Sequence, residues 1–538
     1  MIASVSSAAK QKDYAERFKT DYPFGEAVLQ LFEAAGARIT RLSPLRQGAP
    51  AHSWVLRVRL PQELEEHFSI TRQFLVYCVC TQDLQPRDVR RIPALIRDAE
   101  GEVEADFSML ISADPLAKAK LTEWSAERTA GGITIVPISR KHLERLLKDR
   151  NKSHILSRVI EGWVSERNLY DERAPVTGER FHGRAAILRD LDRHLAKGGG
   201  DVGLFGLRRI GKTSVLLELA DRLKQRDATV PVFIDLESTS GAAHAANRIG
   251  QELARAIAAN GTLTERQALS VLQMPADWST MDPRLLIARV GDALRDALSG
   301  GVLKEHRLIL MLDEAESLLP NPAEPADFAL DLFRALRGVS QETGRLNLVL
   351  AGVNATPTES PFLGDHDNPL FGSLAVYYLG PLEPDECEEM IRKIGRRMQV
   401  RWDGRAAAAL TEHVGAHPLL ARLAASDLVT QFPERPLRPN LEHAKAILDG
   451  FSERQSSVFE QMIQSLKRYY PGELEVLQVV ADGDQVFATE LLEDDPALIN
   501  HLAGYGVLNS EHLSISIPAF RKWLRLKLRV SETQGARE

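Results

Sequence analysis

The chain has 538 residues, and its 67 basic and 74 acidic residues give a formal net charge of −7. The length and the hydrophobic share of 44% predict several folded domains with cores of their own. The charge excludes a global basic field that would draw the chain to nucleic acid or anionic membranes. No apolar run approaches the roughly 20 residues of a membrane helix. Three cysteines make neither a disulfide framework nor a four-cysteine zinc set, which favours a reducing, cytoplasmic location.

Residues 1–150 are predicted to form an α/β domain. The hydrophobic pattern predicts helices at 25–35, 87–99, 116–128 and 141–147, and strands at 37–40, 54–60, 74–80, 107–112 and 133–138. Such alternation is typical of a mostly parallel sheet covered by helices. The element order resembles the restriction-endonuclease-like fold, most closely over residues 108–139.

Nucleases of that fold need an Asp and a Glu-x-Lys on adjacent strands, where carboxylates hold Mg²⁺ and the lysine orients a water. The corresponding strand here carries Cys78-Val79-Cys80, which we interpret as core residues. The resemblance therefore implies a domain without the metal site, which serves as a recognition, scaffold or partner-binding domain. An active nuclease is kept as an alternative.

Residues 151–178 are predicted to be a helical linker between domains. A charged helix at 153–165 is followed by the polar stretch 170–178, which contains proline and glycine. The next domain, 179–380, opens with Phe181-His182-Gly183-Arg184 and a predicted helix at 186–195.

The stretch 201–219 predicts a phosphate-binding loop between a strand and a helix. Residues 206–213 have the sequence GLRRIGKT, which fits G-x-x-x-x-G-K-[ST] after the apolar strand 202–205. Glycines let the backbone curl so that N–H groups and the helix dipole face the phosphates of ATP. Lys212 is expected to reach the β and γ phosphates, and Thr213 to hold Mg²⁺. The predicted binding residues are Gly206, Leu207, Arg208, Arg209, Ile210, Gly211, Lys212, Thr213 and Ser214.

After a predicted strand at 230–236 and helices up to 299, the run RLILMLDE at 307–314 predicts a buried strand with a carboxylate pair at its end. Ligands of parallel sheets bind at that end of the strands. Asp313 is expected to bind Mg²⁺ or its waters, and Glu314 to polarise the attacking water, which predicts hydrolysis of ATP. A GTPase is not favoured, because the motif N-K-x-D is missing and the Asn-Lys-Ser-His at 151–154 ends in histidine.

Residues 181–195 and 206–219 together resemble the opening of STAND-type ATPases, signal-transduction ATPases related to AAA+ proteins, in their archaeal-ATPase-like branch. The resemblance implies that Phe181, Gly183 and Arg184 lie over the adenine. It also implies a γ-phosphate sensor or water-positioning group after the third apolar strand, 346–351. Asn354 is the candidate, and a simple turn residue is its other interpretation.

Three further positions bear on assembly into oligomers. The predicted helix 326–341 carries Arg334 and Arg337, which are candidates for a trans-acting finger, although a solvated helix face is the simpler interpretation. The stretch 368–382 resembles the linking strand of the same family. It has Ser373 where many relatives place an arginine.

Residues 381–450 are predicted to be a helical lid, with helices at 385–398, 404–414 and 418–429. The stretch 415–419 resembles the G-x-P element of STAND lids, which implies that His417 and Pro418 pack near the nucleotide. Helix capping by Gly415 and Pro418 explains the same residues locally.

Residues 451–538 are predicted to be winged-helix-like, with helices at 473–480, 488–492, 497–505 and 520–528 and a strand at 513–517. A winged helix that reads DNA supplies Arg or Lys from its recognition helix. The candidate segment 493–502 is acidic and has neither. The basic residues at 521–529 suit the solvated face of an amphipathic helix.

The sequence thus predicts an α/β, multidomain, ATP-binding and hydrolysing switch of the STAND type. Its nucleotide state would control an N-terminal recognition or effector domain. The alternatives are a DNA-binding regulatory ATPase that uses the C-terminal domain and an ATPase coupled to a nuclease. The expected partners are ATP with Mg²⁺ and either another protein or a second copy of the chain. Charge does not support nucleic acid, and no membrane is expected.

Overall fold

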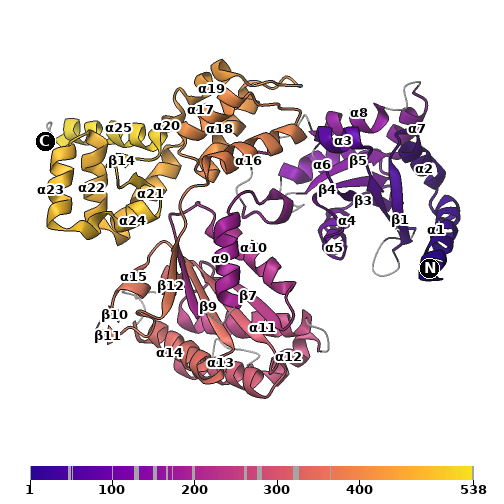
Figure 1. The fold of residues 1–538 in the computed structure, drawn as a ribbon. Coiled ribbons are helices and arrows are strands. Elements are labelled where there is room, and N and C mark those ends of the chain that lie inside the picture. The colour runs from indigo at the N-terminus through magenta and orange to yellow at the C-terminus, as the bar shows by residue number, and fades with distance from the viewer. Residues whose placement is uncertain are drawn as a thin grey trace.

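The structure is a computed structural model. It describes residues 2–45, 50, 52–68, 70–99, 101–126, 133–149, 154–164, 168–171, 174–196, 200–259, 263–274, 281–318, 326–363 and 365–535. Figure 1 shows two sheet-containing units and, between and beside them, two units made mainly of helices. Within these ranges no helix has the length and apolar character that a membrane crossing needs.

The N-terminal unit is a five-stranded sheet with helices packed around it (Figure 1). Its strands, in their order across the sheet, are β1 (Arg38–Pro44), β2 (Trp54–Arg59), β3 (Gln73–Val79), β4 (Val103–Ser112) and β5 (Thr134–Ser139). Its helices are α1 (Ile2–Asp21), α2 (Gly25–Ala34), α3 (Gln62–Phe68), α4 (Pro86–Val89), α5 (Arg91–Arg97), α6 (Ala117–Ala126), α7 (Arg140–Leu147) and α8 (Ile155–Val164). Cys78 is fully buried in β3.

This sheet differs from the mostly parallel one that we predicted. The pairs β1–β2 and β2–β3 are antiparallel, and only β3–β4 and β4–β5 are parallel. Residues 45–53 are too few for the crossover of roughly a dozen residues that a parallel pair needs. The helix predicted at 87–99 is also divided, into α4 and α5 at Arg90. Pro93 has no N–H, so it cannot continue the helical hydrogen bonds across Arg90.

The central unit is a parallel sheet in the order β12-β6-β9-β8-β7. Its strands are β6 (Asp201–Phe205), β7 (Thr229–Asp235), β8 (Arg307–Asp313), β9 (Leu346–Gly352) and β12 (Leu374–Tyr378). Its helices are α9 (Ala185–Ala196), α10 (Lys212–Lys224), α11 (Ala242–Ala259), α12 (Glu265–Val271), α13 (Pro283–Ser299), α14 (Ala326–Thr343) and α15 (Thr356–Glu359), with a hairpin of β10 (Phe362–Leu363) and β11 (His366–Asp367). Since the strands are parallel, the carboxyl ends of β6, β8 and β9 meet at one edge.

Two helical units complete the chain (Figure 1). The first, called here the α16–α19 unit, contains α16 (Pro384–Arg397), α17 (Gly404–His413), α18 (Pro418–Gln431) and α19 (Leu441–Leu448). The second, the C-terminal unit, contains α20 (Phe451–Arg454), α21 (Ser456–Tyr469), α22 (Pro471–Asp482), α23 (Gln485–Asp494), α24 (Asn500–Gly504), α25 (Pro518–Gly535) and a hairpin of β13 (Leu508–Asn509) and β14 (Ser514–Ile515).

The acidic segment 493–502, our candidate recognition segment, is not one helix. α23 ends at Asp494, a 3₁₀ turn spans Pro496–Ile499, and α24 begins afterwards. Asp495 caps the turn, because its carboxylate accepts a hydrogen bond from Ala497 N at 3.0 Å. The break therefore follows from a proline beside a capping aspartate.

The N-terminal unit is joined to the α16–α19 unit through the linker. Tyr170 is fully buried there, and its hydroxyl donates to Ile391 O at 2.7 Å and accepts from Trp402 Nε1 at 2.8 Å. A second link is the ion pair of 3.8 Å between Arg397 on α16 and Glu104 on β4. A movement of α16 would therefore be transmitted to the N-terminal sheet through these contacts.

Candidate nucleotide-binding site

The loop between β6 and α10 makes a tight turn. Arg209 and Gly211 have the left-handed φ values 65° and 104°. A Cβ on Gly206 would lie 2.6 Å from the carbonyl oxygen of Leu379, so the close approach of the two segments requires glycine. Gly211 is the N-cap of α10, which leaves the first N–H groups of that helix open towards the loop. This backbone suits an anion.

Lys212 directs its ammonium group back into the loop. Only 4% of the residue is exposed, and Nζ donates to the carbonyl oxygens of Gly206 at 3.0 Å and Leu207 at 3.2 Å. A buried ammonium needs such acceptors because its desolvation is costly. The positive charge is therefore held at the centre of the loop.

The end of β8 meets the start of α10 through one short hydrogen bond. Thr213 Oγ1 donates to Asp313 Oδ2 at 2.5 Å. Burial raises the pKa of Asp313, while the Thr213 hydroxyl and the Lys212 charge oppose that rise. Glu314 follows with a φ of 52°, a left-handed backbone that a non-glycine residue rarely adopts and that costs free energy. Such strain is characteristic of functional positions.

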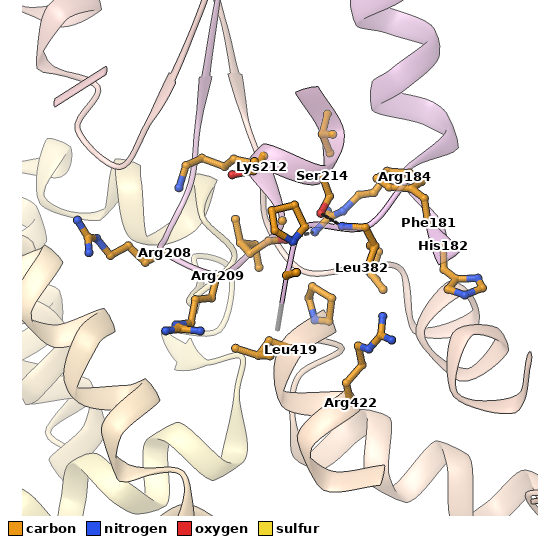
Figure 2. Close-up of a pocket in the computed structure, with 18 of the residues that line it drawn as sticks. Phe181, His182, Arg184, Arg208, Arg209, Lys212, Ser214, Leu382, Leu419 and Arg422 are labelled. Carbon is orange, nitrogen blue, oxygen red and sulfur yellow. Dashed lines mark hydrogen bonds between the residues drawn. The ribbon is translucent and has the colours of Figure 1, made fainter. Parts of the chain in front are cut away.

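A cavity of about 360 Å³ lies beside these groups, between the central unit and the two helical units. Figure 2 shows Arg208 and Arg209 on one side of it and Phe181 and His182 on the other. The cationic side chains in its lining are Arg180, Arg184, Arg208, Arg209, Lys212 and Arg422, against the acids Glu237 and Glu314. The apolar side chains include Phe181, Leu382, Met390 and Leu419. The size falls in the range of small-ligand pockets.

Arg184 joins three segments at this cavity, and Gly183 precedes it with a left-handed φ of 69°. Arg184 donates to Ile210 O at 3.3 Å, and to Gly380 O and Pro381 O at 2.5 and 2.8 Å. Burial lowers the pKa of its guanidinium to about 10, with acidic neighbours opposing the change. The Arg184 side chain thus contacts both the phosphate loop and the segment 380–381, which leads from β12 to α16.

His417 and Pro418 begin α18. Pro418 is the first helical residue and lines the cavity. His417 is the N-cap, and its Nδ1 accepts from Leu420 N at 3.4 Å. Burial and the nearby Arg184 charge lower the pKa of His417 to about 3, so the ring is neutral. The local capping role is therefore present, and Pro418 also reaches the cavity.

Asn354 directs its amide oxygen to the next turn. Oδ1 accepts from Thr356 N at 3.1 Å and from Thr356 Oγ1 at 2.6 Å, and the residue is 7% exposed. These bonds fit a strand-end turn residue. Its role as a sensor stays a prediction.

The arginines of α14 have partners within the central unit. Arg337 donates to the carbonyl oxygen of Pro369, and Arg334 lies 3.5 Å from Asp331. Ser373 donates to Leu370 O at 2.8 Å. These contacts are those of a helix face and a turn, and the finger role stays a prediction.

Two charged residues near the site were not among those predicted. Arg422 on α18 lines the cavity and donates to the carbonyl oxygens of Leu169 and Tyr170 in the linker. The available signal was a single charge in the otherwise apolar run 419–425. Glu316 lies one turn after Asp313 and accepts from Val353 N on the neighbouring strand's end, for which the sequence offered no signal.

The comparisons with known proteins bear on the central unit. Residues 196–356 match the model of a family described as AAA domain. This unit is a P-loop ATPase domain of the AAA+ type. The match begins at the end of α9 and ends at the start of α15, so it includes the phosphate loop of the AAA+ domain, Asp313 and Glu314. No curated protein matches the chain.

Several solved structures are distantly similar. A Walker-type ATPase of Pyrococcus abyssi is 17% identical with a TM-score of 0.45, over 66% of this chain and 99% of its own. The ORC2 protein of Aeropyrum pernix, solved in ADPNP–ADP complexes, is 14% identical with a TM-score of 0.40, over 68% and 98%. The RuvB Holliday junction branch migration motor of Thermotoga maritima is 14% identical with a TM-score of 0.32, over 61% and 90%.

Proposed function

We propose that the AAA+ domain binds ATP with Mg²⁺ and hydrolyses it. The observation that carries the proposal is the 2.5 Å contact between Thr213 and Asp313, which brings a hydroxyl and a carboxylate together beside Lys212. Hydroxyl and carboxylate oxygens are ligands that Mg²⁺ prefers. When bound, Mg²⁺ would neutralise phosphate charge.

Each residue of the site has a defined task in this proposal. Lys212 binds the terminal phosphates, and the loop N–H groups bind the others. Glu314 orients the attacking water and accepts its proton, because a carboxylate at this edge of the sheet faces the site where the γ-phosphate would lie. Arg208 and Arg209 on one side of the cavity suit the phosphates, and Phe181 on the other side, with apolar side chains in the lining, suits the base (Figure 2).

We further propose that the α16–α19 unit acts as a lid that transmits the nucleotide state. Arg184 supports this, since it binds both the phosphate loop and the segment that leads to α16. Tyr170 and the pair Arg397–Glu104 then connect this unit to the N-terminal sheet. The N-terminal unit is the proposed recognition or output domain of a STAND-like switch. We place the chain in the cytoplasm.

The DNA-binding alternative gains little from α25. Lys527 lies 3.2 Å from Glu460, and Lys522 lies 3.9 Å from Glu453. Arg525 donates to the carbonyl oxygen of Ala481. These basic groups therefore have partners within the C-terminal unit, so we favour the switch.

The test is ATP turnover by the full chain, with and without duplex DNA. Lys212→Ala is expected to abolish turnover. Glu314→Gln is expected to lower kcat by about 10²-fold or more while ATP still binds, because only the proton acceptor is lost. Lys224→Ala is the matched control, since this exposed lysine lies at the far end of the same helix.

Two results would contradict the proposal. Native turnover equal to that of Lys212→Ala would exclude hydrolysis at this site. Loss of ATP binding in Glu314→Gln would exclude the role of that carboxylate. Stimulation of turnover by DNA, absent in a chain lacking the C-terminal unit's basic side chains, would favour the alternative.

A further inference from the structure

Glu316 connects the turn after β8 to the end of β9. It lies in the short 3₁₀ turn Ala315–Leu318, directly after the carboxylates at the end of β8. Both of its carboxyl oxygens lie 3.2 Å from Val353 N, the donor. A Cβ on Gly352 would collide with the Glu316 carboxyl group, so the glycine makes room for this contact. The contact is therefore a close and specific one.

Glu314 lacks a hydrogen-bond donor for one of its oxygens. Its Oε2 is buried, and within the described ranges no group donates to it. Glu316 is two residues further along the same turn, and the negative charges of the two carboxylates act on each other. Two ionised carboxylates are both acceptors, so a hydrogen bond between these two side chains would need a proton on one of them.

The environment of Glu316 favours its neutral form. Burial raises the pKa of Glu316 to about 7, and the Glu314 carboxylate acts in the same direction, while Lys212 opposes it. Both Glu316 oxygens lie 3.2 Å from Val353 N, so one of them can still accept from that N–H when the other carries a proton.

We propose that Glu316 is a positioning residue, which accepts a hydrogen bond from Val353 N and so fixes the turn that carries Glu314 to the end of β9. This inference rests on the proposed hydrolysis of ATP. Glu316 touches neither the nucleotide nor the water in this arrangement, so its effect passes through Glu314. It ties the water-activating group to the strand that ends beside Asn354.

Glutamine and alanine at position 316 separate this role from simple packing. Glu316→Gln keeps an oxygen that can accept from Val353 N, and is expected to keep kcat within about threefold of native. Glu316→Ala removes this acceptor and is expected to lower kcat about tenfold or more, with KM for ATP within about threefold. Ser317→Ala is the control, since this exposed neighbour lies on the same turn.

A second readout does not depend on turnover. Amide hydrogen exchange of the peptide that contains Val353, measured by mass spectrometry, is expected to quicken in Glu316→Ala and to stay native in Glu316→Gln. Native kcat in a folded Glu316→Ala chain would overturn the inference. So would a Glu316→Gln chain with kcat about tenfold or more below native, and this outcome decides the case even if the alanine chain does not fold.

The two proposals fail in different ways. If native turnover equals that of Lys212→Ala, hydrolysis is excluded and the positioning role falls with it. If native turnover is Lys212-dependent but neither Glu316 variant changes it, only the positioning role is excluded. Unchanged exchange at Val353 in Glu316→Ala would exclude the link to β9.

Discussion

The hydroxyl of Tyr470 accepts a hydrogen bond from Ala355 N at 2.7 Å and lies 3.1 Å from Val353 O. Tyr505 donates to the same Val353 oxygen at 2.6 Å. These two tyrosines of the C-terminal unit therefore bind the backbone on both sides of Asn354. The C-terminal helices and the edge of the sheet that carries the nucleotide site are mechanically joined.

Replacing Tyr470 by phenylalanine is expected to destabilise this joint by about 1–3 kcal/mol, because the buried Ala355 N–H loses its acceptor. Thermal unfolding followed by circular dichroism measures the change. Tyr469→Phe is the matched control, since this neighbouring tyrosine is only half-buried, and is expected to change stability by at most about 0.5 kcal/mol. Equal melting temperatures for the two variants would contradict the prediction.

The central elements could be predicted because their signals are local. The strand, the glycine loop and the helix between 201 and 224 follow one another in sequence, and β8 is a continuous apolar run that ends in acids. The need for glycine in the loop, the burial of the strands and the capping of the helix are each determined there by a few neighbouring residues. The strand, loop and helix at 201–224 and the acidic end of β8 therefore lie where the local pattern predicted them.

Contacts between distant segments could not be predicted in the same way. Glu316 meets Val353 only because β8 and β9 are neighbours in the sheet, and Tyr470 meets Ala355 only because two units dock. The antiparallel pairing of β1 with β2 depended on the length of a connection rather than on the pattern of the strands. Each of these features is a property of topology.

His501 is expected to stabilise the docked C-terminal unit below neutral pH and to lose this effect in alkali. Burial favours the neutral ring, but hydrogen bonds to Glu359 and Glu473 outweigh it and raise the pKa of His501 to about 9. The stabilisation is complete below the unfolded value of about 6.5 and is lost as pH rises through 9. Melting temperatures of native and His501→Gln chains should therefore converge between pH 6.5 and 9.5.

His512→Gln serves as the control for that series. His512 is exposed in the same unit and should give the native melting curve at each pH. A constant gap between the native and His501→Gln chains across the series would show that His501 acts by packing rather than by charge.

His417 is expected to make the fold sensitive to acid. Burial and the Arg184 charge lower its pKa to about 3. Below about pH 6.5 the unfolded chain therefore binds a proton at this histidine that the folded chain does not bind. Stability then falls between pH 6.5 and 3, by up to about 1.4 kcal/mol per pH unit for this group. Burial lowers the pKa of His182 to about 3 as well, which adds a second such contribution.

Asparagine is the informative replacement at position 417, because it keeps an N-cap acceptor for Leu420 N but does not titrate. His417→Asn should reduce the acid slope of stability without abolishing it, since His182 still contributes. Denaturant unfolding at pH 5 and pH 7 measures that slope. His366→Asn, at an exposed position of β11, should leave it unchanged.

Gly183→Ala is expected to loosen the joint between the phosphate loop and α16. Gly183 has a φ of 69°, and an added Cβ would lie 2.6 Å from Glu386 Oε2, the group that accepts from Arg184 N at 3.2 Å. Backbone strain alone costs about 1–2 kcal/mol, and ADP affinity should fall as Arg184 shifts. Gly338→Ala, where the helix leaves the Cβ free, should instead stabilise by about 0.5–1 kcal/mol. A Gly183→Ala chain that melts and binds ADP like the native one would show that this segment does not hold the site together.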